Sequence, residues 1–144
     1  MKAVDTNVLV YARRVEPTEH TIAERVLQAL ARGSDPWVLP WPCVYEFLRV
    51  VTHPRVFYPP TPLNEAWSAV ELLLDSPAVV PVSEGERHRE VIKSLLRTVP
   101  LTGNILHDAH IAALLIEHGV DEIITADEDF RRFPGLKVTN PFRP

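Results

Sequence analysis

The chain has 144 residues, of which 46% are hydrophobic and 24% are charged, and its formal net charge is −4 at pH 7. These values predict one globular domain over residues 1–144 and argue mildly against a basic nucleic-acid-binding protein, while the single cysteine, Cys43, excludes an internal disulfide. Asp5 interrupts the first apolar stretch and no apolar run approaches roughly 18 residues, so we expect a cytoplasmic protein without a signal peptide or membrane span.

Short apolar segments alternate with helical patterns along the whole chain. In the first half, the predicted elements are a strand at 2–4, helices at 8–14 and 18–32, a strand at 37–39, and helices at 42–51 and 62–74. In the second half they are a strand at 79–82, a helix from a capping box at Ser83 and Glu86 to Thr98, a helix at 105–118, a strand at 122–126, a helical turn through Phe130, and an edge strand at 136–138.

This alternation predicts an α/β fold with a mainly parallel sheet. In such folds, binding sites form beyond the carboxyl ends of the strands. Asp5 and Asp127 each follow a predicted strand directly, which makes both carboxylates candidates for a site at that edge.

A third carboxylate, Asp108, lies near the start of a helix that is apolar on almost every side. Because such a helix is largely buried, Asp108 should point inward or into a cleft, on the face of Ile105 and Ala112. The simpler alternative is a carboxylate at a helix start that accepts hydrogen bonds from backbone amides.

Two further acidic positions leave the same choice between structure and function. Glu46 interrupts another mostly apolar helix, and with Arg49 three residues later it could form an exposed ion pair. Asp127, Glu128 and Asp129 follow one strand, where they could form a solvated turn capped by Asp127. Carboxylates packed together repel one another, however, and a divalent cation such as Mg²⁺ would relieve that repulsion.

Four segments together resemble the PIN-domain ribonucleases, and most of all the VapC-type toxins of prokaryotic toxin–antitoxin modules: VDTNVLVYA, EFLRVVT, TGNILHDAHIAALLIEHG and ITADEDFRRFPGL. The resemblance spans nearly the whole chain in the family's order. It implies a PIN-like three-layer α/β/α sandwich with a mainly parallel central sheet. The family's four acids fall on Asp5, Glu46, Asp108 and Asp127, and its variable final acid falls on Asp129.

The resemblance implies an endoribonuclease that depends on Mg²⁺ or Mn²⁺ and leaves 5′-phosphate and 3′-hydroxyl ends. A cation held by the acids would activate water and neutralise charge on the phosphate. The catalytic residues are then Asp5, Glu46, Asp108 and Asp127, and the metal ligands are these four with Asp129. The residues expected to orient ligands or substrate are Thr6, Asn7, Thr125 and Arg49.

The resemblance also implies an RNA substrate, a small antitoxin partner and a homodimer. The antitoxin is expected in an apolar groove, with Trp41, Phe57, Tyr58 and Trp67 as candidate lining residues, although such side chains are most often core. The cations that could hold RNA are Arg13, Arg14, Arg49, Arg55 and the Arg87-His88-Arg89 cluster with Lys93, each of which is more simply a solvated surface charge.

Other chemistry is less well supported by the sequence. His107 and His110 lie about 100° and 200° around their helix from Asp108, so a zinc site shared with Asp108 is not expected. Cys43 is expected to be a small buried apolar residue and not a nucleophile.

Three other protein classes remain as alternatives. A receiver-like signalling domain needs an acceptor aspartate near mid-chain, and residues 50–74 contain none. A haloacid-dehalogenase-like phosphatase needs an aspartate two residues after its nucleophile, where this chain has Asn7. A PIN-like module that binds RNA or protein without catalysis is disfavoured by the complete acid set.

Overall fold

Five short strands form one parallel sheet in the computed structural model, which describes residues 1–143. The strands are β1 (Lys2–Val4), β2 (Trp37–Pro40), β3 (Val79–Val82), β4 (Glu122–Ile124) and β5 (Lys137–Thr139). Their order is β3-β2-β1-β4-β5, and every neighbouring pair is parallel. The first strand of the chain is therefore the central one, and β5 is the predicted edge strand.

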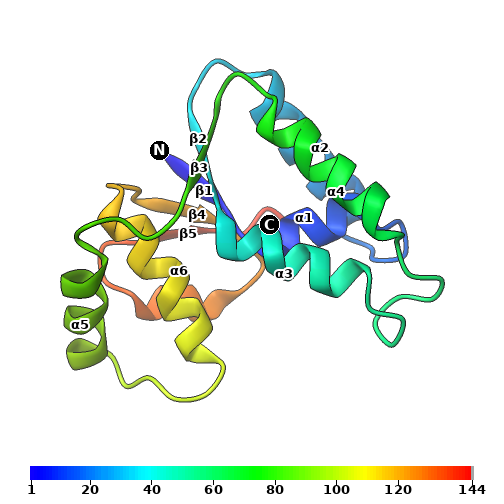
Figure 1. Ribbon diagram of the computed structural model, residues 1–144. Coiled ribbons are helices and arrows are strands. Elements are labelled where there is room, and N and C mark those ends of the chain that lie inside the picture. The colour runs from blue at the N-terminus through cyan, green and yellow to red at the C-terminus, as the bar shows by residue number, and fades with distance from the viewer. Residues whose placement is uncertain (144) are drawn as a thin grey trace.

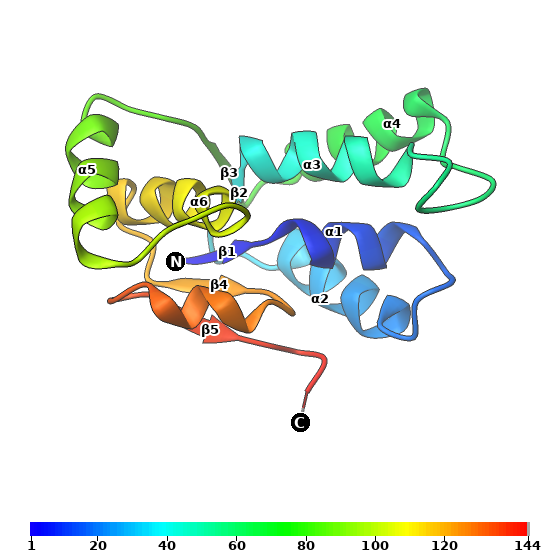
Figure 2. The ribbon, with the colours of Figure 1, turned by 90° about the horizontal axis from the view of Figure 1, so that it is seen from below.

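Helices cover both faces of this sheet. They are α1 (Thr6–Arg13), α2 (His20–Arg32), α3 (Trp41–Val51), α4 (Leu63–Leu74), α5 (His88–Thr98), α6 (Ile105–Glu117) and the short 3₁₀ helix η1 (Glu128–Arg132). Figure 1 shows α1 to α4 on one side of the strands and α5 and α6 on the other, and Figure 2 shows the same division from below. The predicted α/β/α sandwich is confirmed.

The chain order explains why the helices divide in this way. The steps from β1 to β2 and from β2 to β3 run toward one edge, whereas the step from β3 to β4 returns across the sheet. Because parallel crossovers are right-handed, connections that run in opposite directions lie on opposite faces. The buried β2, whose four residues are all covered, lies between these two layers as an apolar strand should.

One predicted helix start is wrong. Ser83 does not cap a helix, because α5 begins only at His88, with Arg87 at its N-cap and no capping side-chain bond. The backbone N–H groups of Gly85 and Arg87 instead donate to the carboxylate of Glu117 on α6, each over 3.1 Å. A long-range contact thus replaces the local capping box that the sequence pattern predicts.

The register of the sheet brings distant parts of the chain to one edge. Val4 of β1 pairs with Ile124 of β4, and Ala3 pairs with Val38 of β2. The residues that follow β1, β2 and β4 therefore meet at the carboxyl edge of the sheet. Among residues 1–143, no helix is long and apolar enough to cross a membrane.

Candidate active site

Asp5 is fixed at the junction between the central strand and the first helix. Its backbone N–H donates to the carbonyl of Ile124 over 3.1 Å, which continues the pairing of β1 with β4. Its side chain is the N-cap of α1 and accepts a 2.7 Å hydrogen bond from the N–H of Thr6. With a relative exposure of 5%, Asp5 is a buried carboxylate that the backbone holds in place.

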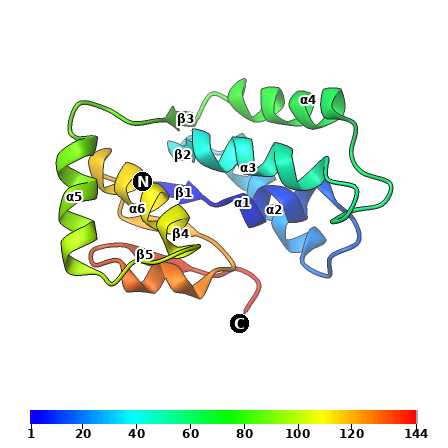
Figure 3. The ribbon, with the colours of Figure 1, turned by 60° about the horizontal axis from the view of Figure 1, so that its bottom comes forward.

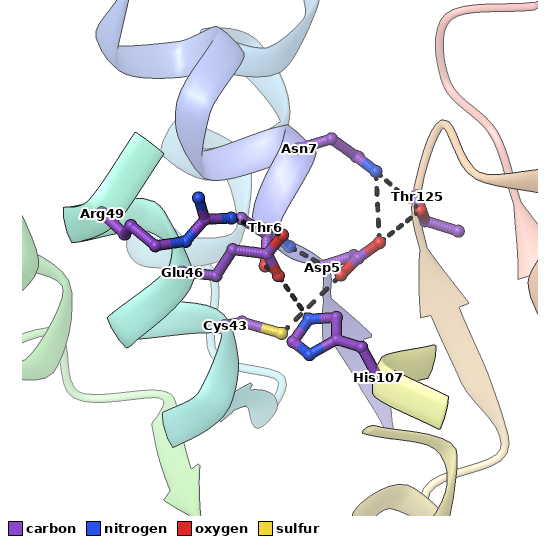
Figure 4. Close-up of polar contacts among 8 residues, drawn as sticks. All are labelled: Asp5, Thr6, Asn7, Cys43, Glu46, Arg49, His107 and Thr125. Carbon is purple, nitrogen blue, oxygen red and sulfur yellow. Dashed lines mark hydrogen bonds and ion pairs between the residues drawn. The ribbon is translucent and has the colours of Figure 1, made fainter. Parts of the chain in front are cut away.

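Two side chains connect Asp5 to the end of β4 (Figure 4). The hydroxyl of Thr125 donates to Oδ2 of Asp5 over 2.7 Å, and Nδ2 of Asn7 donates to the same oxygen over 3.1 Å. Oδ1 of Asn7 accepts the N–H of Ala126 over 3.0 Å. Burial raises the pKa of Asp5, while the bonds from Thr125 and Thr6 oppose that rise.

Glu46 projects from α3 toward the same edge of the sheet. Its Oε2 accepts a 3.2 Å bond from the hydroxyl of Thr6 and contacts Nε2 of His107 on α6 (Figure 4). Arg49 is a weaker partner, with 3.8 Å between its Nη2 and Oε1 of Glu46. The hydrogen bond from His107 lowers the pKa of Glu46 and raises the pKa of His107 itself. The exposed Glu46–Arg49 pair considered above is therefore present but secondary.

Three other carboxylates form the closest acidic group. One oxygen each of Asp108, Asp127 and Asp129 lies within 4.8 Å of the other two. Asp127 is also the N-cap of η1, since it accepts the N–H of Asp129 over 2.9 Å. Its own N–H donates to the hydroxyl of Thr125 over 2.9 Å. Thr125 thus contacts both Asp5 and the backbone that carries Asp127.

The environment of Asp108 indicates an unbalanced negative charge. Burial raises its pKa to about 7, and the nearby charges of Asp127 and Asp5 add to that rise. A carboxyl group in this position is easily neutralised either by a proton or by a cation. Because the donor atoms are all carboxylate oxygens, the residues suit a hard divalent ion such as Mg²⁺, which keeps some of its water ligands.

These acids lie at an open cleft of about 700 Å³, whose lining residues are Pro42, Tyr45, Glu46, Arg49, Asn104, Ile105, His107, Asp108, Asp127 and Asp129. Five predicted site residues are among them. The other four, Asp5, Thr6, Asn7 and Thr125, do not line the cleft, and they contact one another or Glu46 through the hydrogen bonds described above. Asp5 and Glu46 stand outside the close group of three carboxylates.

His107 is a site residue that the sequence interpretation missed. Helix geometry places it about 100° around the helix from Asp108, outside the face on which the sequence predicts the site. The cleft is bounded by α3 as well as by the end of β4, so a residue rotated toward α3 still reaches it and contacts Glu46. Predicting His107 as a cleft residue requires knowing that α6 lies opposite α3, and helix periodicity alone does not give that information.

Most of the suggested RNA-binding cations lie elsewhere. Arg13 pairs with Glu65 over 2.9 Å, and Arg14, which pairs with Glu16, lies over the ring of Phe57. Of the suggested cations, Arg49 alone lines the acidic cleft. Cys43 is fully buried, as expected, and its pKa is raised well above the usual value, first by burial and then by the charge of Asp5.

A second, apolar cavity of about 290 Å³ lies among the helices on the other side of α1 and α3. We call it the apolar groove, and its lining residues are Leu9, Ala12, Arg13, Glu24, Leu27, Gln28, Leu39, Val44, Phe47, Ala69, Val70, Leu72 and Leu73. None of the four aromatic residues suggested for such a groove lines it. Trp41 instead packs near Tyr45, Phe57 lies under Arg14, and Tyr58 and Trp67 are exposed.

The same fold occurs in known proteins. The PIN domain family matches residues 2–136. The chain is 40% identical to VapC ribonuclease Mb2897 of Mycobacterium bovis, over 98% of this chain and 95% of that protein. It is 34% identical to ribonuclease VapC37 of Mycobacterium tuberculosis, over 98% and 97% respectively. The chain therefore belongs to the PIN-domain family, and within it to the VapC ribonucleases.

Solved structures have the same fold at lower sequence identity. VapBC-1 of nontypeable Haemophilus influenzae has a TM-score of 0.67 at 22% identity, covering 99% of this chain and 98% of that one. VapC20 of Mycobacterium tuberculosis, described as a sarcin-ricin loop cleaving toxin, has a TM-score of 0.66 at 17% identity, covering 91% and 93%. These likenesses support the fold.

Proposed function

We propose that the protein is a divalent-metal-dependent endoribonuclease and the toxin of a toxin–antitoxin pair. The observation that carries this proposal is the group of Asp108, Asp127 and Asp129 at an open cleft, next to Glu46 and the buried Asp5. Relatives that cover nearly the whole chain are named ribonucleases, which supports RNA as the substrate. Mg²⁺ suits the all-oxygen donors best, and Mn²⁺ is the natural substitute.

The residues divide into ligands and side chains that position them. Asp108, Asp127, Asp129 and Glu46 would hold the ion at the cleft, with Asp5 behind them. A divalent ion, when bound, would lower the pKa of a water molecule and neutralise negative charge on a phosphate. Thr125 and Asn7 orient Asp5, Thr6 orients Glu46, and Arg49 offers a cation to an RNA phosphate at the cleft.

RNA cleavage by the purified chain tests this function directly. Wild type should cleave with Mg²⁺ or Mn²⁺ and lose activity in a chelator. Asp108→Asn and Asp127→Asn should each lose at least about a hundredfold, because each removes a charge from the ion site. Asp35→Asn, at an exposed aspartate away from the cleft, is the matched control. Cleavage that persists in the chelator, or full activity in both cleft variants, would exclude the mechanism.

We further propose that the apolar groove binds the antitoxin. Several solved structures with this fold are toxin–antitoxin complexes, which supports such a partner. An apolar cavity rimmed by Arg13, Glu24 and Gln28 suits an amphipathic helix with apolar anchors. Leu72→Lys would place a charge at an exposed position of the groove, and Leu63→Lys, at an exposed residue of the same helix that does not line the groove, is its control.

Coexpression with the neighbouring reading frame measures this partnership. The toxin alone should arrest growth, and the neighbouring protein should rescue wild type and Leu63→Lys but not Leu72→Lys. Normal growth with the toxin alone would argue against the toxin role while leaving the nuclease open. We also propose a homodimer, from the family resemblance, and light scattering of the purified chain measures it.

A further inference from the structure

A second group of possible metal ligands lies outside the acidic cleft. One ligand atom each of Glu84, His88 and His110 lies within 4.8 Å of the other two. Glu84 belongs to the loop between β3 and α5, His88 begins α5, and His110 lies on α6. Figure 3 shows α5 and α6 side by side on their face of the sheet, so these three positions meet where the loop enters the helix pair.

The contacts within this group are already formed. Nε2 of His110 is 2.5 Å from Oε1 of Glu84, and the rings of His88 and His110 meet edge-on with 5.7 Å between their centroids. The side chains of Glu84, His88 and His110 are 46%, 20% and 37% exposed, so an ion from solvent can reach them. Two imidazoles and a carboxylate are the ligand set that binds Zn²⁺ with an open fourth position.

The fourth residue, Glu117, makes this group more than a surface cluster. Nδ1 of His88 is buried without a hydrogen-bond partner among residues 1–143, and it faces Oε1 of Glu117 over 3.6 Å. The carboxylate of Glu117, only 5% exposed, also accepts the N–H groups of Gly85 and Arg87. A carboxylate behind one ring nitrogen orients a histidine so that its other nitrogen faces a metal.

We propose that Glu84, His88 and His110 bind a zinc ion, with Glu117 orienting His88 through Nδ1 and leaving Nε2 for the metal. The bound ion would join the loop that carries Glu84 to both α5 and α6. His118 already holds the same loop, since its Nε2 lies 2.8 Å from the carbonyl oxygen of Ser83. The bound ion would therefore add a third attachment to the loop before α5, whose backbone already contacts the side chains of Glu117 and His118 at the end of α6.

This site is separate from the acidic cleft although both use α6. His110 lies about 200° around the helix from Asp108, and it is absent from the residues that line the cleft. The ligand chemistry also differs. The proposed site offers two imidazoles, which suit zinc, whereas the close group of Asp108, Asp127 and Asp129 offers only carboxylate oxygens. Occupation of one site can thus be measured with the other disabled.

Zinc binding to the full-length, chelator-treated chain tests the proposal by titration calorimetry. The background variant Asp108→Asn with Asp127→Asn removes two carboxylates of the cleft and should keep the proposed site. In that background, His88→Gln, His110→Gln and Glu84→Gln should each weaken zinc binding by at least about tenfold. His53→Gln, in a distant loop, is the matched control and should bind as the background does.

Thermal unfolding gives an independent readout that does not require RNA cleavage. Zinc should raise the Tm of the background variant and of His53→Gln, and it should raise the Tm of Glu84→Gln much less. Glu84 lies on an exposed loop, so this variant is expected to fold even if the partly buried His88 cannot be replaced. Equal zinc affinity in all variants would overturn the proposal. So would the loss of zinc binding on the two background substitutions, before any residue of the proposed site is changed.

Discussion

The hydroxyl of Thr125, at the end of β4, donates a 2.7 Å hydrogen bond to the carboxylate of Asp5, at the end of β1. These residues are 120 positions apart in the chain, yet their strands are neighbours at the centre of the sheet. Thr125 is fully buried, and its oxygen also accepts from Asn7 and from the N–H of Asp127. This one hydroxyl therefore helps to position two predicted metal ligands, Asp5 and Asp127.

Replacing this hydroxyl should damage both stability and activity. Thr125→Val keeps the shape of the side chain but leaves its buried partners unsatisfied, so the free energy of unfolding should fall by about 1–3 kcal/mol. RNA cleavage at saturating Mg²⁺ should also fall, because Asp5 and Asp127 lose a common anchor. Thr125→Ser keeps the hydroxyl and should retain most of the activity. Equal activity of the valine and serine variants would contradict this role.

The raised pKa of Asp108 predicts a specific pH dependence in the absence of metal. In the unfolded chain the carboxyl ionises near 3.8, whereas in the folded chain it ionises near 7. Between these values the folded state holds a proton that the unfolded state has lost, so stability decreases as the pH rises through this window. Above about pH 7 the full cost is present, and below about pH 4 it is absent.

Urea unfolding in a chelator, from about pH 4 to about pH 8, measures this effect. Asp108→Asn should be more stable than wild type at the alkaline end, and the difference should vanish at the acidic end. Mg²⁺ should reduce the difference by stabilising the ionised carboxylate. Asp35→Asn should follow the wild-type curve. A constant difference at every pH would mean that Asp108 titrates normally.

Asp129 falls on the variable final acid of the family pattern, and the structure places it in the close group with Asp108 and Asp127. Asp129→Asn should therefore raise the Mg²⁺ concentration for half-maximal cleavage by roughly tenfold. Glu128→Gln is the matched control, because Glu128 pairs with Arg131 and does not line the cleft. If both variants need the same Mg²⁺ concentration as wild type, Asp129 is not a ligand.

If Glu46 binds the ion as proposed, His107 should compete with the ion, because its ring contacts the same carboxylate. His107→Ala should lower the Mg²⁺ concentration for half-maximal cleavage several-fold, since Glu46 no longer has to exchange this partner. The measurement is a Mg²⁺ titration of initial cleavage rates beside His53→Ala. A higher Mg²⁺ requirement in His107→Ala would instead show that the histidine helps to hold Glu46 in its binding position.

The sequence predicts the elements well because each depends on local pattern. The apolar runs of the strands, Pro42 near the start of α3 and Gly119 after α6, with φ at +70°, are signals within a few residues of where they act. The capping box at Ser83 fails because a competing interaction comes from Glu117, more than thirty positions away. Local patterns cannot report which distant carboxylate will capture a backbone N–H.

The candidate site shows the same division between local and long-range information. Asp5, Glu46, Asp108 and Asp127 could be named because each carboxylate interrupts an apolar context or follows a strand. The contact of His107 with Glu46 and the meeting of His88 with His110 depend on which helices pack together. The suggested aromatic residues do not line the apolar groove for a related reason, since large apolar side chains do not reveal which cavity they line.

The central position of β1 has a consequence for the protein during its synthesis. Asp5 leaves the ribosome well before its hydroxyl partner and its neighbouring strand, which lie at residues 122–125. Asp127 and Asp129 follow later still. A nascent chain that stops before these residues has neither the completed sheet nor the close carboxylate group. The cleft is thus assembled only after residues 122–129 have been synthesised, and under the proposed function a shorter nascent chain lacks the means to cleave RNA beside the ribosome that is making it.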